Sequence, residues 1–143
     1  MSETCEVPLF NSSDKEVKEI LSKYKTIAVV GISPKEDRPS FRVASYLKSK
    51  GYKIIPVNPG HEEVLGEKCY PSLKEVPEKV EIVDIFRKAE AVEEVIKQAI
   101  EIGAKVAWMQ LGIVNNKAAK LAKDAGMQVV MDKCMLVEHG KLF

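Results

Sequence analysis

The sequence predicts an α/β fold in which helices cover both faces of a parallel sheet. Five short apolar runs have the near-continuous hydrophobic character of strands that are buried on both faces. Amphipathic helical segments separate these runs, and such alternation is typical of right-handed βαβ crossovers. We therefore expect residues 1–143 to form one domain, a Rossmann-like three-layer α/β/α structure with a five-stranded parallel sheet in the order 3-2-1-4-5.

The strands are expected where β-branched and other apolar residues follow one another. Pro56 in the second run lacks a backbone donor, which indicates an edge strand or a place where no ladder donor is needed. The expected strands are residues 26–31, 53–58, 81–86, 105–110 and 128–132.

The helices are predicted from their periodicity and from their end signals. Ser13 and Glu16 have the spacing of a capping box at the start of the first helix. Glycines follow three other helical segments and are typical of helix C-termini. The expected helices are residues 13–23, 40–50, 89–102 and 115–125, with a short helix at 72–76 and a loose tail over 1–12.

Composition limits the classes of partner. The 22 basic and 21 acidic residues give a net charge of +1, which provides no overall attraction to nucleic acid or to an anionic membrane. The sequence has neither a signal peptide nor a run of the roughly 20 apolar residues that span a bilayer, so we expect a cytoplasmic protein. The three cysteines form no CxxC pair, and we expect no metal site.

A ligand site is expected at the loops that follow the strands. In a sheet of this predicted order, the switch point lies between the first and fourth strands, and ligands bind beyond the carboxyl ends. The strand-end residues are Gly31-Ile32-Ser33, Asn58-Pro59-Gly60, Phe86-Arg87, Gln110-Leu111-Gly112 and Asp132-Lys133-Cys134.

The first of these loops has the features of an anion site. Gly31 permits a sharp turn, and the helix that starts near Ser40 offers free N–H groups and the positive end of its dipole. Lys35, Arg38 and Arg42 lie in or beside the turn, and arginine can bind a phosphate through two donors. We favour a phosphate site over an ordinary turn with solvated charges.

Two common nucleotide motifs are missing from this loop. A GxGxxG fingerprint would need glycine at Ser33 and Glu36, and no GxxxxGK[ST] sequence occurs. The acidic residue that binds the ribose of NAD should end the second strand, where this chain has Asn58. A nicotinamide-dependent oxidoreductase is therefore disfavoured, although NAD binding without binding of a more anionic nucleotide would restore that interpretation.

Several segments together resemble the small stand-alone CoA-binding proteins and the nucleotide-binding domain of the succinyl-CoA synthetase α-subunit. They are VVGIS followed by RPS, then GYKIIPVNPG, LGEKCYPSL, DIFR, GAKVAWMQLG and AGMQVVMDKCMLVEH, from about Lys25 to His139. The resemblance implies that coenzyme A binds across the carboxyl ends of the strands. The second synthetase domain, with its phosphorylated histidine, lies outside the match, and neither His61 nor His139 has the glycine-rich setting of that residue, so ligase chemistry is not expected.

The resemblance also implies roles for particular residues. Those near the phosphates would be Gly31, Ile32, Ser33 and Pro34, supported by Arg38 and Ser40. Asn58 and Pro59 would border the adenosine, and Gly60 and His61 would lie near the ribose phosphate, where the synthetase has a basic residue. Phe86 and Arg87 would cover the other side of the adenine, and Gln110 and Gly112 would border the pantetheine path.

Two functions remain open. The first is a non-catalytic binding or regulatory module for CoA or acyl-CoA, a monomer or a weak homodimer with apolar residues such as Leu136 and Val137 at its surface. The alternative is a CoA-dependent or thiol-disulfide enzyme that uses Cys134, activated by His139. We favour the first, because the strand-end loops carry no paired general acid and base, and because a buried structural cysteine explains Cys134 better than a reactive thiol does.

Overall fold

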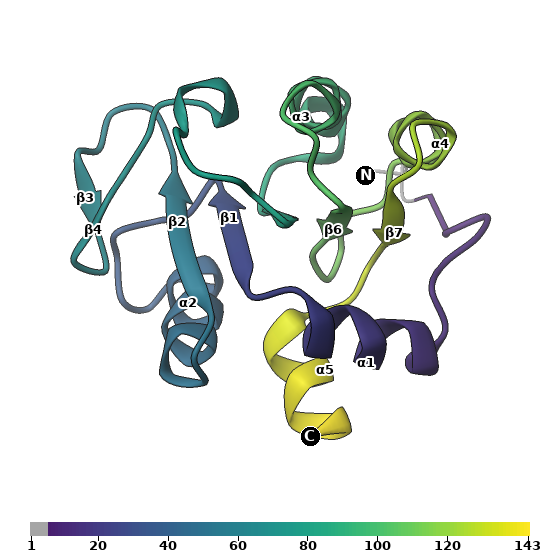
Figure 1. Cartoon of the computed structure of the whole chain (residues 1–143), viewed down its shortest axis with the longest axis horizontal. Coiled ribbons are helices and arrows are strands. Elements are labelled where there is room, and N and C mark those ends of the chain that lie inside the picture. Colours follow the sequence, from purple (N-terminus) through teal and green to yellow (C-terminus); the bar gives the residue numbers. More distant parts are fainter. Residues whose placement is uncertain (1–5) are drawn as a thin grey trace.

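A five-stranded parallel sheet forms the centre of the molecule (Figure 1). We describe it from a computed structural model, which describes residues 6–143. The strands are β1 (Thr26–Val30), β2 (Lys53–Val57), β5 (Ile82–Ile85), β6 (Val106–Met109) and β7 (Gln128–Val130). The predicted Rossmann-like α/β class is confirmed, and each strand lies within the segment that its apolar run predicted.

The position of β5 corrects the predicted strand order. The sheet reads β2-β1-β5-β6-β7, which is 2-1-3-4-5 for these five strands rather than 3-2-1-4-5. Pro56 gives a physical reason: its carbonyl faces outward to Tyr70 N at 3.0 Å, so the missing N–H also lies on the outer side of β2. A full strand is disfavoured on that side, and the third strand pairs with β1 instead. The switch point therefore lies between β1 and β5.

Helices cover the sheet on both faces (Figure 1). One layer contains α1 (Asp14–Lys23), α2 (Pro39–Ser49) and α5 (Met135–Leu142). The opposite layer contains α3 (Ala89–Glu101), α4 (Asn116–Asp124) and the short 3-10 helix η1 (Leu73–Glu75), which replaces the short helix expected at 72–76. The capping box at α1 is present, with Ser13 and Glu16 each bonding the other's backbone N–H.

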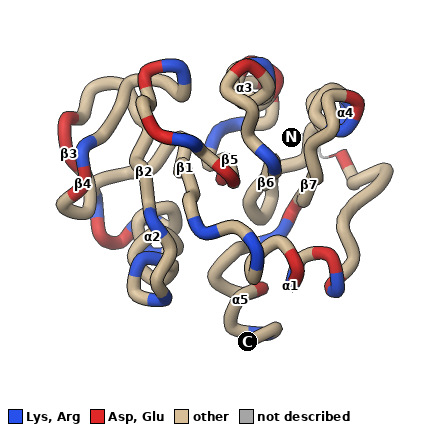
Figure 2. Tube along the Cα trace, viewed as in Figure 1, with Lys and Arg blue, Asp and Glu red and all other residues tan. Residues whose placement is uncertain are grey.

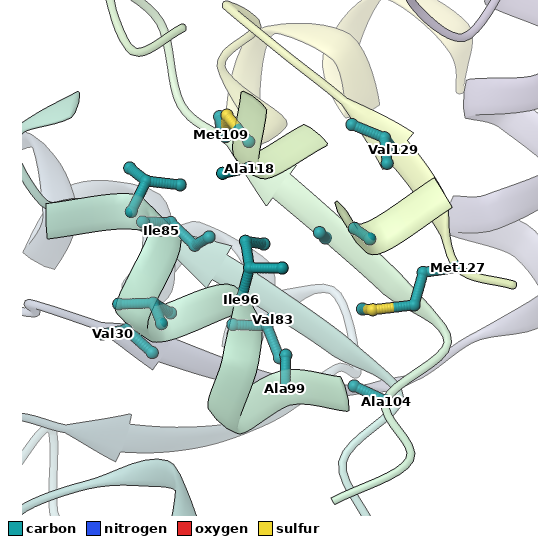
Figure 3. Close-up of a cluster of buried hydrophobic side chains, with 14 of the residues drawn as sticks. Val30, Val83, Ile85, Ile96, Ala99, Ala104, Met109, Ala118, Met127 and Val129 are labelled. Atoms are coloured by element: carbon teal, nitrogen blue, oxygen red, sulfur yellow. The ribbon is translucent and has the colours of Figure 1, made fainter. Parts of the chain in front are cut away.

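The core beneath α3 and α4 is built from aliphatic side chains. Val83 and Ile85 of β5 point towards α3, where Ile96 and Ala99 meet them (Figure 3). Met109 and Val129 extend the same cluster towards α4. This half of the molecule is consequently held by close apolar packing.

Three elements and one segment differ from the sequence prediction. A hairpin of β3 (Glu63–Val64) and β4 (Glu67–Lys68) lies beyond β2, and α5 follows β7. Residues 11 and 12, expected within a loose tail, bond to the edge of β7 and the residue after it. Asn11 Oδ1 accepts from Met131 N at 2.9 Å, and Ser12 Oγ donates to Val129 O at 2.7 Å.

Charged residues of both signs are distributed over both helical layers (Figure 2). Helix α2 differs, because its charged residues, Arg42 and Lys48, are both basic. None of the helices within residues 6–143 has the length and apolar character that crossing a membrane requires.

Candidate functional site

The carboxyl ends of β1 and β5 meet in close contact at the switch point. A Cβ atom on Gly31 would lie only 2.3 Å from Phe86 O and 3.0 Å from Arg87 Cδ. Gly31 also has a φ of 88°, in the region that side chains disfavour. Both observations require glycine here, and the close approach places the first and third loops next to each other.

A cavity of about 540 Å³ opens beside this contact, between η1 and α3. Its volume is within the range of small-molecule sites. Five of the predicted binding residues line it: Gly31, Asn58, Pro59, Phe86 and Arg87. Sequence reasoning missed the rest of the wall, which comprises Val30, Val57, Pro71, Ser72, Leu73, Ala91, Glu94, Val95 and Gln98. Of these, Pro71 to Leu73 lie in the LGEKCYPSL segment that the family resemblance had marked.

The first loop is ordered by hydrogen bonds to its own backbone. Ser40 Oγ accepts from Ser33 N at 2.9 Å, and Ser33 Oγ accepts from Lys35 N at 3.1 Å. Asn58 Nδ2 donates to Ile32 O at 2.6 Å, which joins the first and second loops. Ile32 is fully buried, so its side chain belongs to the core and does not face the ligand surface.

The start of α2 leaves cationic side chains at the surface. Arg38 is the N-cap residue and makes no side-chain capping bond, and Pro39 is the first helical residue. Pro34, Arg38 and Arg42 are exposed. This combination of a helix N-terminus and arginine can receive a phosphate.

Gly60 and His61 lie outside the cavity beside β1 and β5. They border a second, more open pocket together with Lys68 and Cys69, and Pro71 lines both pockets. His61 is exposed. The second loop is therefore divided, with Asn58 and Pro59 in the main cavity and the next two residues beside it.

Gln110 and Gly112 lie at the end of β6 and do not line the cavity. Gln110 is buried, and its Nε2 donates to Asp84 Oδ1 at 2.6 Å. Gly112 N donates to Asp132 Oδ1 at 2.7 Å. Both residues thus shape the loop that follows β6.

Asp84 was not among the predicted site residues. It lies in β5, is fully buried, and its burial raises the pKa of its carboxyl group to about 8, against a lowering influence from Gln110. The sequence contained a signal for it, since a single acidic residue interrupts the apolar run EIVDIF of a strand predicted to be buried on both faces.

The proposed pairing of Cys134 with His139 gains no support. Cys134 is the N-cap residue of α5 and is partly buried. His139 Nδ1 instead lies 2.9 Å from the Tyr46 hydroxyl, and its ring stacks on Phe143 with 4.8 Å between centroids. The imidazole is thus committed to aromatic contacts between α2 and the C-terminus.

Cys69 has no features of a reactive thiol. Burial raises the pKa of the Cys69 thiol, which lies 3.5 Å from Asn58 O, so this thiol is less readily ionised. Cys5 lies outside the described residues. Within residues 6–143, no three His, Cys, Asp or Glu side chains are placed to hold a metal ion.

A comparison with known protein families identifies the family to which this chain belongs. The model of the CoA binding domain matches residues 25–140. The chain belongs to the CoA-binding domain family. The matched residues include β1, the first loop, the residues that line the cavity and most of α5.

Individual relatives show what the chain is similar to. It is 44% identical to the uncharacterized protein YneT of Bacillus subtilis, over 90% of this chain and 96% of the relative. A hypothetical protein from Pyrococcus horikoshii has a solved structure with 46% identity and a TM-score of 0.90, and 96% of each chain is covered. An ADP-forming acetate–CoA ligase of Archaeoglobus fulgidus is 38% identical over 83 residues, which are 57% of this chain but only 12% of the ligase.

Proposed function

We propose that this protein binds coenzyme A or an acyl-CoA at the carboxyl ends of β1, β2 and β5, and acts as a non-catalytic binding or regulatory module. The observation that carries the proposal is the cavity at the β1–β5 switch point, which gathers Gly31, Asn58, Pro59, Phe86 and Arg87 in a member of the CoA-binding domain family.

The chemistry of the cavity suits the nucleotide end of CoA. Phe86 provides an aromatic surface for adenine, and Arg87 provides a cation for a phosphate. Asn58 offers an amide in place of the carboxylate that binds the NAD ribose, so a ribose bearing a 3′-phosphate meets no repulsion from that position. The pyrophosphate would then lie towards Ser33, Arg38 and the start of α2.

The non-catalytic part of the proposal depends on two observations: how little of the ligase this chain matches, and which side chain His139 contacts. The match to the acetate–CoA ligase is confined to 12% of that enzyme, and His139 pairs with Tyr46 rather than with Cys134. A monomer or weak homodimer in the cytoplasm stays a prediction, which size-exclusion chromatography and cell fractionation would test.

Isothermal titration with CoA, 3′-dephospho-CoA and NAD tests the proposal. Native mass spectrometry of the purified protein would first report any CoA that co-purifies. We expect wild-type protein to bind CoA, and Arg87→Ala to bind it roughly tenfold or more weakly, since one charge-assisted hydrogen bond is lost. Lys120→Ala is the control, because Lys120 is exposed on α4 and pairs with Asp124 away from the cavity. Binding of NAD without CoA would refute the proposal.

A further inference from the structure

Asp84 occupies the middle of the sheet at the switch point. It lies in register with Val29 of β1 and Trp108 of β6. Val83 and Ile85 belong to the core under α3, so the alternation along a strand directs Asp84 to the face covered by α1, α2 and α5. Ile82, Val29 and Trp108 share that face, and the carboxyl group is surrounded by apolar neighbours.

The carboxyl group has one protein partner. Its Oδ1 accepts the Gln110 bond of 2.6 Å, while Oδ2 has no hydrogen-bond partner within the described part of the chain. Ionisation without a cationic partner would be costly in this setting. The raised pKa, about 8, accordingly leaves the group uncharged at neutral pH. Asp84 thus serves as a neutral anchor for the Gln110 amide.

Gln110 in turn fixes the loop at the end of β6. Its carbonyl accepts from Ile113 N at 2.9 Å, and Gly112 is held by Asp132. Between these anchors, the Leu111 side chain lies at the surface, with 68% of its area exposed. The loop therefore presents an apolar side chain at the carboxyl edge of the sheet.

The position of this loop relates it to the cavity. β6 is the next strand after β5, about 5 Å farther along the edge of the sheet. A ligand whose nucleotide lies beside β1 and β5, and whose remaining chain continues along this edge, meets the loop next. The pantetheine arm of CoA carries methyl and methylene groups that match Leu111, and amides that match backbone groups.

We propose that Asp84 is a positioning residue that, through Gln110, holds residues 110–113 so that Leu111 contacts the pantetheine arm of CoA. The inference rests on the proposed function and goes beyond it, because it assigns a role to a residue that no ligand can touch directly. It predicts that the Asp84–Gln110 pair affects binding of the pantetheine arm of CoA and leaves binding of the nucleotide unaffected.

Titration with two ligands tests this role: CoA, and adenosine 3′,5′-bisphosphate, which lacks the arm. Asp84→Leu removes the acceptor for Gln110, and we expect CoA affinity to fall roughly tenfold while bisphosphate affinity stays within about twofold. Asp84→Asn keeps one acceptor and one donor, so it should restore CoA affinity to within about twofold of wild type.

An exposed position provides a test that does not depend on folding of the Asp84 variants. Leu111→Ser should weaken the binding of CoA alone, and Leu9→Ser is its control, a leucine beside α4 that is at least as exposed. Unchanged CoA binding by Leu111→Ser, or equal loss of both ligands in a folded Asp84→Leu protein, overturns the inference. Absence of CoA binding by wild-type protein would instead refute the proposed function.

Discussion

The two faces of the sheet differ in the kinds of side chain that they bury. On the side of α3 and α4, every side chain that β5 contributes is aliphatic, and the cavity opens at the edge of this layer. On the side of α1, α2 and α5, the same strand contributes Asp84, and the layer also holds the hydrogen-bonded pair Tyr46–His139. The difference teaches that one face is stabilised by packing and the other partly by specific polar pairs.

This contrast has consequences for both stability and binding. Apolar packing is insensitive to pH and is lost in proportion to the atoms removed. A buried carboxyl group couples stability to proton concentration and fixes one arrangement of its partner. The loops that follow β5 and β6 lie at the edge of the sheet, between these two faces.

The largest effect is expected from a truncation within the apolar face. Ile96→Ala removes a fully buried side chain of α3 and should lower the free energy of unfolding by about 2–5 kcal/mol at any pH in the native range. Ile100→Ala, on the same helix and partly exposed, is the matched control and should cost much less. Urea denaturation of both variants measures the difference, and equal losses would contradict the assignment of the core.

The next effect concerns Gly31, where the loops after β1 and β5 touch. Gly31→Ala and Gly60→Ala both place a side chain at a φ near 90°, but only the first creates a contact, with Phe86 O. We expect Gly31→Ala to destabilise the protein by about 1–3 kcal/mol more than Gly60→Ala, and to weaken CoA binding. Thermal unfolding with and without CoA gives both quantities, and similar values for the two variants would show that the close approach is unimportant.

The third prediction concerns the pH dependence of stability, which should come from the face that contains Asp84. The pKa of Asp84 is about 8 in the folded protein against an ordinary 3.8, so the folded state keeps a proton that the unfolded state loses. The stabilisation is therefore full below the ordinary pKa and is lost as the pH rises towards 8, by at most about 1.4 kcal/mol per pH unit. Asp84→Asn should flatten this slope by one proton in urea denaturation between about pH 5 and 8. Parallel profiles for the two proteins would contradict it.

Local structure was predictable because its signals are local. The capping box of Ser13 and Glu16, the glycines after the helices and the apolar runs placed most elements to within a residue or two. Helix α5 escaped prediction because it is short, contains Gly140, and has an N-cap residue, Cys134, that makes no side-chain capping bond. The two-residue strands β3 and β4 are too short to show a period.

The candidate site was predictable only in part. Parallel topology places strand ends at one edge, so Gly31, Asn58 and Phe86 could be grouped without a structure. The wall supplied by α3 could not, because its residues reach the cavity through packing and carry no binding signal of their own. Asp84 was visible as an acidic residue in an apolar run, but its partner Gln110 comes from another strand.

The sequence by itself determined the alternation of strands and helices, the glycine and arginine content of the first loop, and the absence of the NAD fingerprint. These depend on neighbouring residues and on short periods. The tertiary structure alone decided that the third strand lies beside β1, that the cavity forms against α3, and that Asp84 meets Gln110. Strand order and buried pairing depend on contacts between residues distant in sequence, and their free energy exists only once the chain has folded.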